Sequence, residues 1–184
     1  MRLSDVTAAA VRTLLGYACL SKGVLAINAA GAATVKTTNA ILYSADGILL
    51  SKAALAAQSI APTHGASVAG DSVAGSSYIQ PANTTVYYVL AVNAAGTVAV
   101  VQGNYLGQVP TLDPTKGVGA LAAIGTSAKG DGSVPNPPDG YTAFGIIKVT
   151  TDGSTTFTPG TTLLDAAGLA VAYFDVCLLP SARP

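Results

Sequence analysis

Two apolar runs separated by a short polar link form the strongest pattern in the chain. Residues 86–92 and 97–102 are rich in Val, Tyr and Leu and carry no charge, which is typical of strands in a half-buried sheet. The link is Asn93-Ala94-Ala95-Gly96. Asn favours the start of a turn, and Gly96 can adopt the left-handed conformation that closes a short hairpin. We therefore predict a central β-hairpin over residues 86–102.

The same pattern recurs at three other places. Residues 24–31 (VLAINAAG) nearly repeat residues 89–96 (VLAVNAAG), and an Asp-Gly pair interrupts the apolar runs of residues 41–50 and 146–157. Four hairpin signals predict a mainly β protein, an antiparallel β-sandwich or barrel built of hairpins. The short repeat could also arise by coincidence in a chain this rich in Ala and Gly.

The first twenty residues show helical spacing instead. Ser4 can cap a helix, and Asp5 lies in its first turn, where the helix dipole favours an anion. Apolar residues follow at intervals of three or four: Leu3, Val6, Ala10, Leu14 and Tyr17. We predict a helix over residues 4–20, and divide the chain into an N-terminal helical arm (1–23) and an antiparallel β domain (24–184). The arm either docks on a neighbouring subunit or covers one end of its own sheet.

The remaining segments alternate between strand-like and loop-like composition. Further strands are expected at 33–37, 39–43, 48–51 and 169–179, the last buried on both faces apart from Asp175. The Ala-rich segment 52–58 could form a helical turn. Segments 61–77 and 104–140 are rich in Gly, Pro and small polar residues and are predicted to be loops.

The chain carries few charges for its length. Only 10% of its residues are charged, with nine basic and nine acidic, and the formal net charge is zero. A typical soluble domain carries roughly a quarter, and a separate molecule with so few charges is poorly protected against self-association. We therefore expect a component of an assembly, whose surface other subunits cover.

The same composition argues against two classes of partner. The lysines lie far apart in the sequence, so no nucleic-acid site is expected, because such a site needs clustered positive charge. No signal peptide is predicted, and no membrane partner is expected, because no apolar window reaches the roughly 18 residues of a membrane span.

Residue types that carry chemistry are sparse. His64 is the only histidine, and it lies in segment 61–77, where we expect a solvated loop and not a catalytic base. Cys19 and Cys177 could pair across the chain, but we favour two free thiols, since Cys in an apolar segment is usually a small buried hydrophobe. There is no Glu, and turn-forming Asp-Gly pairs explain several Asp residues, so the paired carboxylates of a glycan hydrolase are not expected. We predict neither an enzyme, nor a metal site, nor a cofactor.

Tyr87 and Tyr88 are adjacent in the predicted central strand, so their side chains point to opposite faces of the sheet. One is expected in the core and the other at solvent or a partner, where Tyr is favoured; the sequence does not tell which. The candidate oligomer or lattice contacts are residues of the arm and these two tyrosines: Leu3, Val6, Leu14, Tyr17, Tyr87 and Tyr88.

Three C-terminal segments resemble a pattern found in virion proteins of tailed bacteriophages. They are residues 135–149 (PNPPDGYTAFGIIKV), 157–162 (FTPGTT) and 172–176 (AYFDV), and residues 87–90 (YYVL) add to the resemblance. It covers roughly the C-terminal half of the chain. The resemblance implies a β-rich structural protein of a phage particle, with no catalytic residues to carry over.

The function that this resemblance implies is that of a capsid decoration or minor capsid protein. Such a protein would bind and stabilise the lattice of the major capsid protein as a homo-oligomer, a trimer being favoured by the three-fold positions of a capsid. It would be located in the virion after synthesis in the cytoplasm of the host bacterium. The alternative is a tail, fibre or baseplate protein involved in host attachment.

Overall fold

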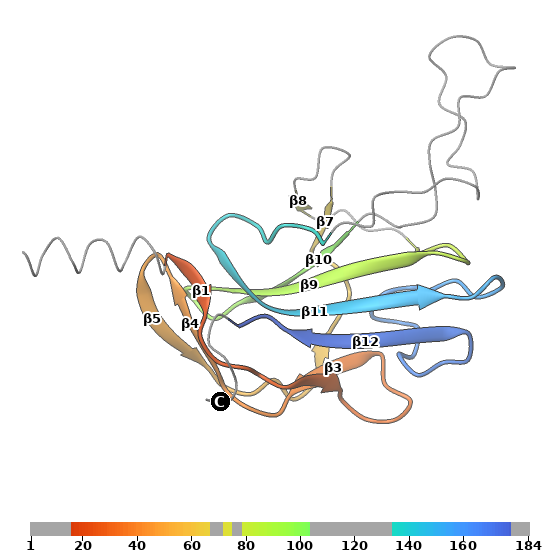
Figure 1. Cartoon of the computed structure of the whole chain (residues 1–184), viewed down its shortest axis with the longest axis horizontal. Coiled ribbons are helices and arrows are strands. Elements are labelled where there is room, and N and C mark those ends of the chain that lie inside the picture. Colours follow the sequence, from red (N-terminus) through yellow and green to blue (C-terminus); the bar gives the residue numbers. More distant parts are fainter. Residues whose placement is uncertain (1–15, 67–71, 75–78, 104–133, 178–184) are drawn as a thin grey trace, which may run out of the picture.

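The part of the chain that the structure describes forms three β-sheets around one apolar core (Figure 1). The computed structural model describes residues 16–66, 72–74, 79–103 and 134–177. Within these ranges it contains twelve strands and no helix. The prediction of a mainly β, largely antiparallel protein is therefore confirmed.

Two of the sheets have three strands each and the third has six. The first has the order β1-β4-β5, with β1 (Tyr17–Cys19), β4 (Ile41–Ala45) and β5 (Ile48–Lys52). The second has the order β2-β3-β6, with β2 (Leu25–Ile27), β3 (Thr34–Thr37) and β6 (Gln58–Ser59). The six-stranded sheet has the order β12-β11-β9-β10-β7-β8, with β12 (Leu169–Asp175), β11 (Tyr141–Thr151), β9 (Thr85–Asn93), β10 (Val98–Gln102), β7 (His64–Ala66) and β8 (Ser72–Ala74). Neighbouring strands are antiparallel except β10 and β7, which are parallel.

The central hairpin is formed by β9 and β10, as predicted. The amide of Gly96 donates to the carbonyl of Asn93 at 2.9 Å, and the Asn93 side chain accepts from the amide of Thr97 at 2.9 Å. Gly96 has φ +77°, in the left-handed region that suits Gly. Residues 88–92 are buried without interruption, which explains why this strand is apolar at successive positions.

Two further predicted hairpins are confirmed. Strands β2 and β3 are joined through a turn in which Gly31 has φ +70°. Strands β4 and β5 are joined by Asp46 and Gly47, with φ +52° and +71°. Two consecutive positive φ values define the turn type whose twist matches that of a two-stranded hairpin. Since the β2–β3 and β9–β10 hairpins each contain one copy of the VLAxNAAG motif, the motif marks a hairpin in both of its copies.

The fourth predicted hairpin, over residues 146–157, is wrong. Strand β11 pairs with β9 on one side and β12 on the other, so both of its edges are already occupied. The chain after Asp152 turns away from β11, and Phe157 forms an isolated bridge with Gln80. A local Asp-Gly turn signal was outweighed here by pairing between strands that are distant in sequence.

The predicted N-terminal helix does not extend to residue 20. Residues 17–19 form strand β1, which pairs with β4, and Cys19 belongs to the core. Strand β1 thus lies among the residues assigned to the helical arm, because the extended backbone pairs with β4 and places Ala18 and Cys19 in the interior. Residues 1–15, which carry most of the predicted helix, lie outside the described residues.

Three other expectations are corrected. Residues 52–58 form no helical turn, since β5 extends to Lys52 and β6 begins at Gln58. Segment 61–77 is not only loop, because its small residues permit strands β7 and β8 to extend the six-stranded sheet. Strand β12 is not buried on both faces: it lies at a sheet edge, and Phe174 is 49% exposed.

A few hydrogen bonds join the sheets across the core. The hydroxyl of Tyr43 on β4 donates to the carbonyl of Asn93 at 2.9 Å, and that of Thr142 on β11 donates to the carbonyl of Ser44 at 2.6 Å. The amide of Leu25 on β2 donates to the carboxylate of Asp175 on β12 at 3.1 Å. These contacts fix both three-stranded sheets against the six-stranded one.

Candidate interaction surface

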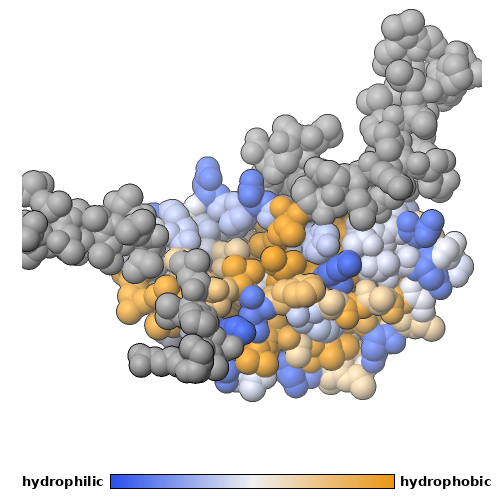
Figure 2. All heavy atoms as spheres, viewed as in Figure 1, coloured by the Kyte–Doolittle hydropathy of each residue, from blue (hydrophilic) through white to orange (hydrophobic). Residues whose placement is uncertain are grey.

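Large apolar side chains are exposed at the end of the molecule that the β1-β4-β5 sheet forms. Ile48 is 59% exposed and Leu49 61%, on the outermost strand β5. Tyr17 on β1 is also exposed, and so to a smaller degree is Leu42 on β4. Hydrophobic residues gather at this end in the space-filling view (Figure 2). We call these four residues the apolar end.

Local sequence builds this surface around a tight turn. The Asp46-Gly47 turn brings β5 back alongside β4, and the amide of Gly47 donates to the carbonyl of Gly16 at 3.2 Å. The Tyr17 hydroxyl donates to the carboxylate of Asp46. This hydrogen bond, followed by partial desolvation and the nearby charges of Asp46 and Asp139, raises the pKa of Tyr17. The turn is thereby tied to the neighbouring strand at the exposed end.

A row of apolar side chains follows one face of the six-stranded sheet and becomes exposed at its β12 edge. Residues that pair across strands lie on the same face, and the register aligns Val101, Val89, Ile146 and Phe174 across β10, β9, β11 and β12. We call these four residues the outer row. Val101 and Val89 are buried, Ile146 is half-buried and Phe174 is exposed. Exposure thus rises toward the β12 edge.

The two adjacent tyrosines are now distinguished. Tyr88 is fully buried in the core, so it cannot be a surface contact, and its place among the candidate contacts is corrected. Tyr87 is half-buried and lies on the same face as the outer row, opposite Lys148. The expectation that one tyrosine belongs to the core is confirmed, because adjacent residues in a strand point to opposite faces.

Of the predicted arm contacts, only Tyr17 falls in the described part of the chain. It lies on strand β1 and not on a helix, but it is exposed. Leu3, Val6 and Leu14 lie outside the described residues.

His64 lies on β7, not in a loop. Its Nδ1 is 3.0 Å from the hydroxyl of Thr63, and its ring packs edge-on against Tyr141, with centroids 6.3 Å apart.

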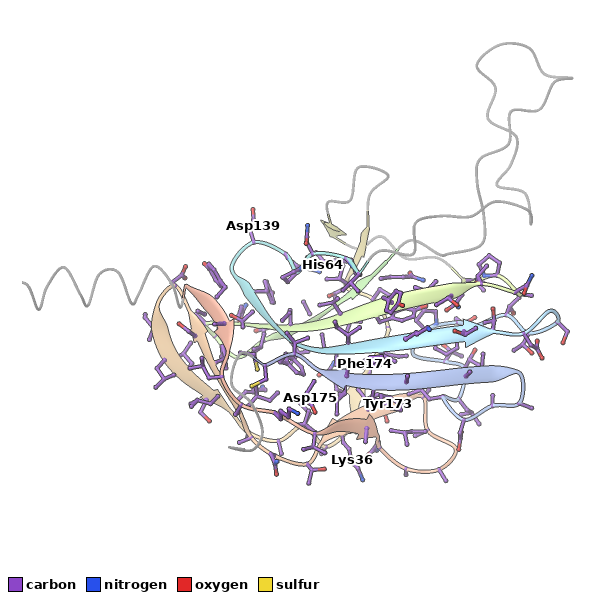
Figure 3. The ribbon with its side chains drawn as sticks, viewed as in Figure 1. Lys36, His64, Asp139, Tyr173, Phe174 and Asp175 are labelled. Atoms are coloured by element: carbon purple, nitrogen blue, oxygen red, sulfur yellow. The ribbon has the colours of Figure 1, made fainter. Side chains whose placement is uncertain are left out.

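Asp139 points away from the body of the molecule (Figure 3). Among the described residues, no three His, Cys, Asp or Glu side chains lie close enough together to hold a metal ion.

Both cysteines carry thiols, as favoured from the sequence. Cys19 is buried on β1, and burial raises the pKa of its thiol to about 11. The thiolate is the reactive form of Cys, so this side chain is poorly suited to nucleophilic chemistry near neutral pH.

The carboxylate of Asp175 has a structural role, because it joins two strands. It lies at the end of β12 (Figure 3) and accepts the hydrogen bond from the amide of Leu25 described above. Its opposite neighbour on β11 is Gly145, where a Cβ atom would lie 2.8 Å from the Leu25 side chain. The absence of a side chain at Gly145 thus lets β2 approach the six-stranded sheet.

A buried polar cluster was not foreseen from the sequence. The Tyr88 hydroxyl donates to Gln80 Oε1 at 3.2 Å and accepts from Gln102 Nε2 at 3.3 Å. Gln80 Nε2 also donates to the carbonyls of Thr84 and Val149. Both Gln side chains are fully buried. A single Gln at each end of an apolar run is a weak signal, because strand ends are often exposed.

The exposed residues of β5 were missed as well. The sequence showed an apolar run, and such a run is usually assigned to the core. Only the position of β5 at the edge of its sheet reveals that Ile48 and Leu49 are both exposed.

The described part of the chain holds no helix that is long and apolar enough to cross a membrane. No family model, curated protein or solved structure matches the chain.

Proposed function

We propose that this chain is a structural component of a tailed-bacteriophage particle. The favoured role is that of a capsid decoration or minor capsid protein, which binds the major capsid protein as a homo-oligomer and stabilises its lattice. A trimer suits the three-fold positions of a capsid. The proposal rests on the resemblance of residues 135–149, 157–162 and 172–176 to virion proteins, and on the surface of the molecule.

One observation carries the proposal: the molecule exposes apolar strands while it carries few charges. Ile48, Leu49 and Phe174 are each about half exposed or more, and only 10% of the chain is charged. A contiguous exposed apolar surface marks a site where other molecules bind, and Ile48 and Leu49 are adjacent on one strand. A subunit whose strands are covered in an assembly needs few charges to remain in solution.

The exposed end of the outer row, Ile146 and Phe174, is our candidate for the lattice contact. These two side chains lie toward the β12 edge of the sheet, on the same face as the half-buried Tyr87. Aromatic side chains supply much of the binding energy at protein interfaces. Residues 1–15, with Leu3, Val6 and Leu14, would add an arm that packs on a neighbouring subunit. We further infer that the three sheets form an antiparallel sandwich, since all three contribute to one core cluster.

Stabilisation would follow from mass action. A protein that binds the assembled lattice but not the separated capsid subunits adds its binding free energy to the assembled state. No chemical step is required, and the chain would act by being present at a fixed ratio to the major capsid protein.

Disassembly of the particle tests this proposal. Particles that lack the chain would be heated, or treated with a chelator, with and without added full-length protein, while genome release is followed with a DNA-binding dye. We expect the release temperature to rise and to saturate as the chain is added. A release temperature that does not change, with no sedimentation of the chain with the particles, would count against the proposal.

A matched pair of variants locates the contact. Phe174→Lys places a charge at the exposed end of the outer row and should abolish the rise in release temperature. Ile79→Lys changes a side chain of similar exposure, 59% against 49% for Phe174, outside that row, and should leave the rise intact. Equal effects of the two variants would exclude the outer row as the contact.

The tail, fibre or baseplate role is the second candidate. It would be favoured by an exposed aromatic cluster that could bind host glycans, but the two exposed aromatic residues of the described part, Tyr17 and Phe174, lie on different sheets. Binding to host cells, without binding to the capsid lattice, would support this second role.

A further inference from the structure

We propose that strand β5 is a self-recognition edge, which pairs antiparallel with β5 of a second copy of this chain about a two-fold axis. The pairing would join two β1-β4-β5 sheets into one continuous sheet.

The backbone of β5 has an open edge within the described part of the chain. Strand β5 has one neighbour, β4, within the described part of the chain. Ala45 and Ile48 flank the two-residue turn, and such a pair exchanges both of its backbone hydrogen bonds. Hydrogen-bonded pairs alternate with non-bonded pairs along the ladder. The N–H and C=O groups of Leu49 and Ser51 therefore point away from β4.

Contacts of β4 support this assignment independently. Leu42, which lies opposite Ser51, turns its own backbone toward β1: its carbonyl accepts from the amide of Leu20 at 2.8 Å, and its amide donates to the hydroxyl of Ser21 at 2.7 Å. Leu42 and Ser51 are therefore a non-bonded pair. The outward edge of β5 can accept another strand.

The side chains at this edge are apolar and exposed. Ile48 and Leu49 are the most exposed large apolar residues of β5 and among the most exposed of the described chain, at 59% and 61%. Natural edge strands are usually protected by charge, proline or a bulge. Residues 48–51 are Ile-Leu-Leu-Ser, so this edge has none of these devices until Lys52. An apolar edge without protection favours strand addition.

The distribution of charge along this edge selects a second copy as the partner. With Leu49 opposite Leu49 of the second copy, an antiparallel register places Ile48 opposite Leu50, twice over, and brings Lys52 of each copy beside the Asp46-Gly47 turn of the other. Asp46 itself lies in that turn, with φ +52°, three residues before Leu49, and Lys52 lies three residues after it. Opposite charges at close range attract each other.

Asp46 and Lys52 can each form this contact while they keep their present hydrogen bonds. Asp46 uses Oδ1 to accept from Tyr17, and a carboxylate has a second oxygen that can accept from a cation. Lys52 donates to the carbonyl of Gly96 at 2.8 Å, and an ammonium group carries three donors. The edge is therefore self-complementary in backbone, apolar contact and charge.

This inference does not rest on the proposed function. Pairing through β5 is two-fold, so a trimer would need a different surface, and the two contacts could coexist in one assembly. A chain that pairs through β5 but does not bind particles would support this inference and contradict the capsid proposal.

The test is the mass of the full-length protein in solution. Sedimentation equilibrium over a range of concentrations should show the wild-type chain in a reversible equilibrium with a dimer. Leu49→Lys should weaken that dimer by about a hundredfold, since it removes a Leu side chain of each copy from the contact and places like charges opposite each other at the two-fold axis. Leu163→Lys, at a residue 44% exposed outside the β1-β4-β5 sheet, should leave the dimer unchanged. Far-ultraviolet circular dichroism would verify that both variants keep the β fold.

A second variant tests the register. Asp46→Asn keeps a residue type that tolerates positive φ but removes the charge, so it should weaken the dimer severalfold at low salt and reduce its salt dependence. Asp165→Asn, an exposed carboxylate outside β5, is the matched control. The inference is overturned if the wild-type chain stays monomeric, if Leu49→Lys and Leu163→Lys behave alike, or if Asp46→Asn has no effect.

Discussion

At the scale of single residues, the core contains buried polar side chains as well as apolar ones. Tyr88 connects Gln80 to Gln102 through its hydroxyl, and all three side chains are fully buried. Buried polar groups are costly when they lose a partner, because neither water nor another group replaces the hydrogen bond.

Tyr88→Phe should therefore destabilise the protein. Removing the hydroxyl takes one hydrogen bond from Gln80 Oε1 and one from Gln102 Nε2, so we expect a loss of roughly 1–3 kcal/mol in the free energy of unfolding. Urea denaturation would measure it. Tyr87→Phe is the matched control and should cost less, since its side chain is only half-buried. Equal losses in the two variants would contradict the role assigned to the buried cluster.

The two cysteines should differ in reactivity. Cys19 is buried, and its pKa is raised to about 11, whereas Cys177 is half-buried. Native protein treated with a maleimide at neutral pH should be labelled at Cys177 first, and Cys19 should react at a comparable rate only after unfolding. Peptide mass spectrometry would identify the labelled residue. Rapid labelling of Cys19 in the native protein would contradict its position in the core.

At the scale of elements, hydrogen bonds within a turn and between two turns hold together parts of the chain that are distant in sequence. The Asp152 carboxylate accepts from the amides of Ser154 and Thr155 at 2.9 and 2.7 Å, while its own amide donates to the carbonyl of Gly168. Gly168 has φ +84°, and a Cβ atom there would lie 2.1 Å from the Thr155 hydroxyl. The turn after β11 and the turn before β12 are therefore in close contact.

This arrangement predicts a dependence of stability on pH. Hydrogen bonds from Ser154 and Thr155 lower the pKa of Asp152. A group whose pKa is lower in the folded state stabilises it fully above the unfolded pKa of about 3.9, and this contribution is lost as pH falls through the folded pKa. Asp152→Asn should therefore be less stable than wild type at neutral pH, and the difference should shrink below about pH 4.

Urea titrations of both proteins at a series of pH values would measure the effect. Asn at this position can still accept a hydrogen bond, so the comparison isolates the charge. A difference between the two proteins that stays constant down to about pH 2.5 would show that ionisation of Asp152 does not contribute.

The elements that the sequence predicts well are those decided by local chemistry. The β2–β3, β4–β5 and β9–β10 hairpins each carry a turn of Asn or Asp with Gly, and each is found where the pattern places it. The Asp152-Gly153 signal failed because β11 pairs instead with β9 and β12. Strands β7 and β8 were missed because their pairing depends on β10, and small polar residues give no local signal.

At the scale of the whole molecule, the candidate site was only partly predictable. Low charge and apolar strands led us to expect contacts with other subunits; Tyr17 was named for its place in the predicted arm, and Tyr87 for its residue type in the central strand. The exposure of Ile48, Leu49 and Phe174 could not be predicted, because a strand's place at the edge or the centre of a sheet is set by long-range pairing. The same pairing places Tyr88 in the core and Tyr87 on the outer face.

Two surfaces of this molecule thus have separate proposed roles. The β5 edge is assigned to a second copy of the chain, and the outer row to a lattice of other subunits. Variants at Leu49 and Phe174 should therefore affect self-association and particle binding separately, because substitutions at distant sites without shared partners act independently.

The most direct measurement is the copy number of this chain in purified phage particles from cells that express it, determined by quantitative mass spectrometry against the major capsid protein. The account predicts a fixed integer ratio that is reproduced between preparations and survives further purification. A chain that is absent from the particles, or present at a variable trace level while most of it remains in the cell lysate, would contradict the account.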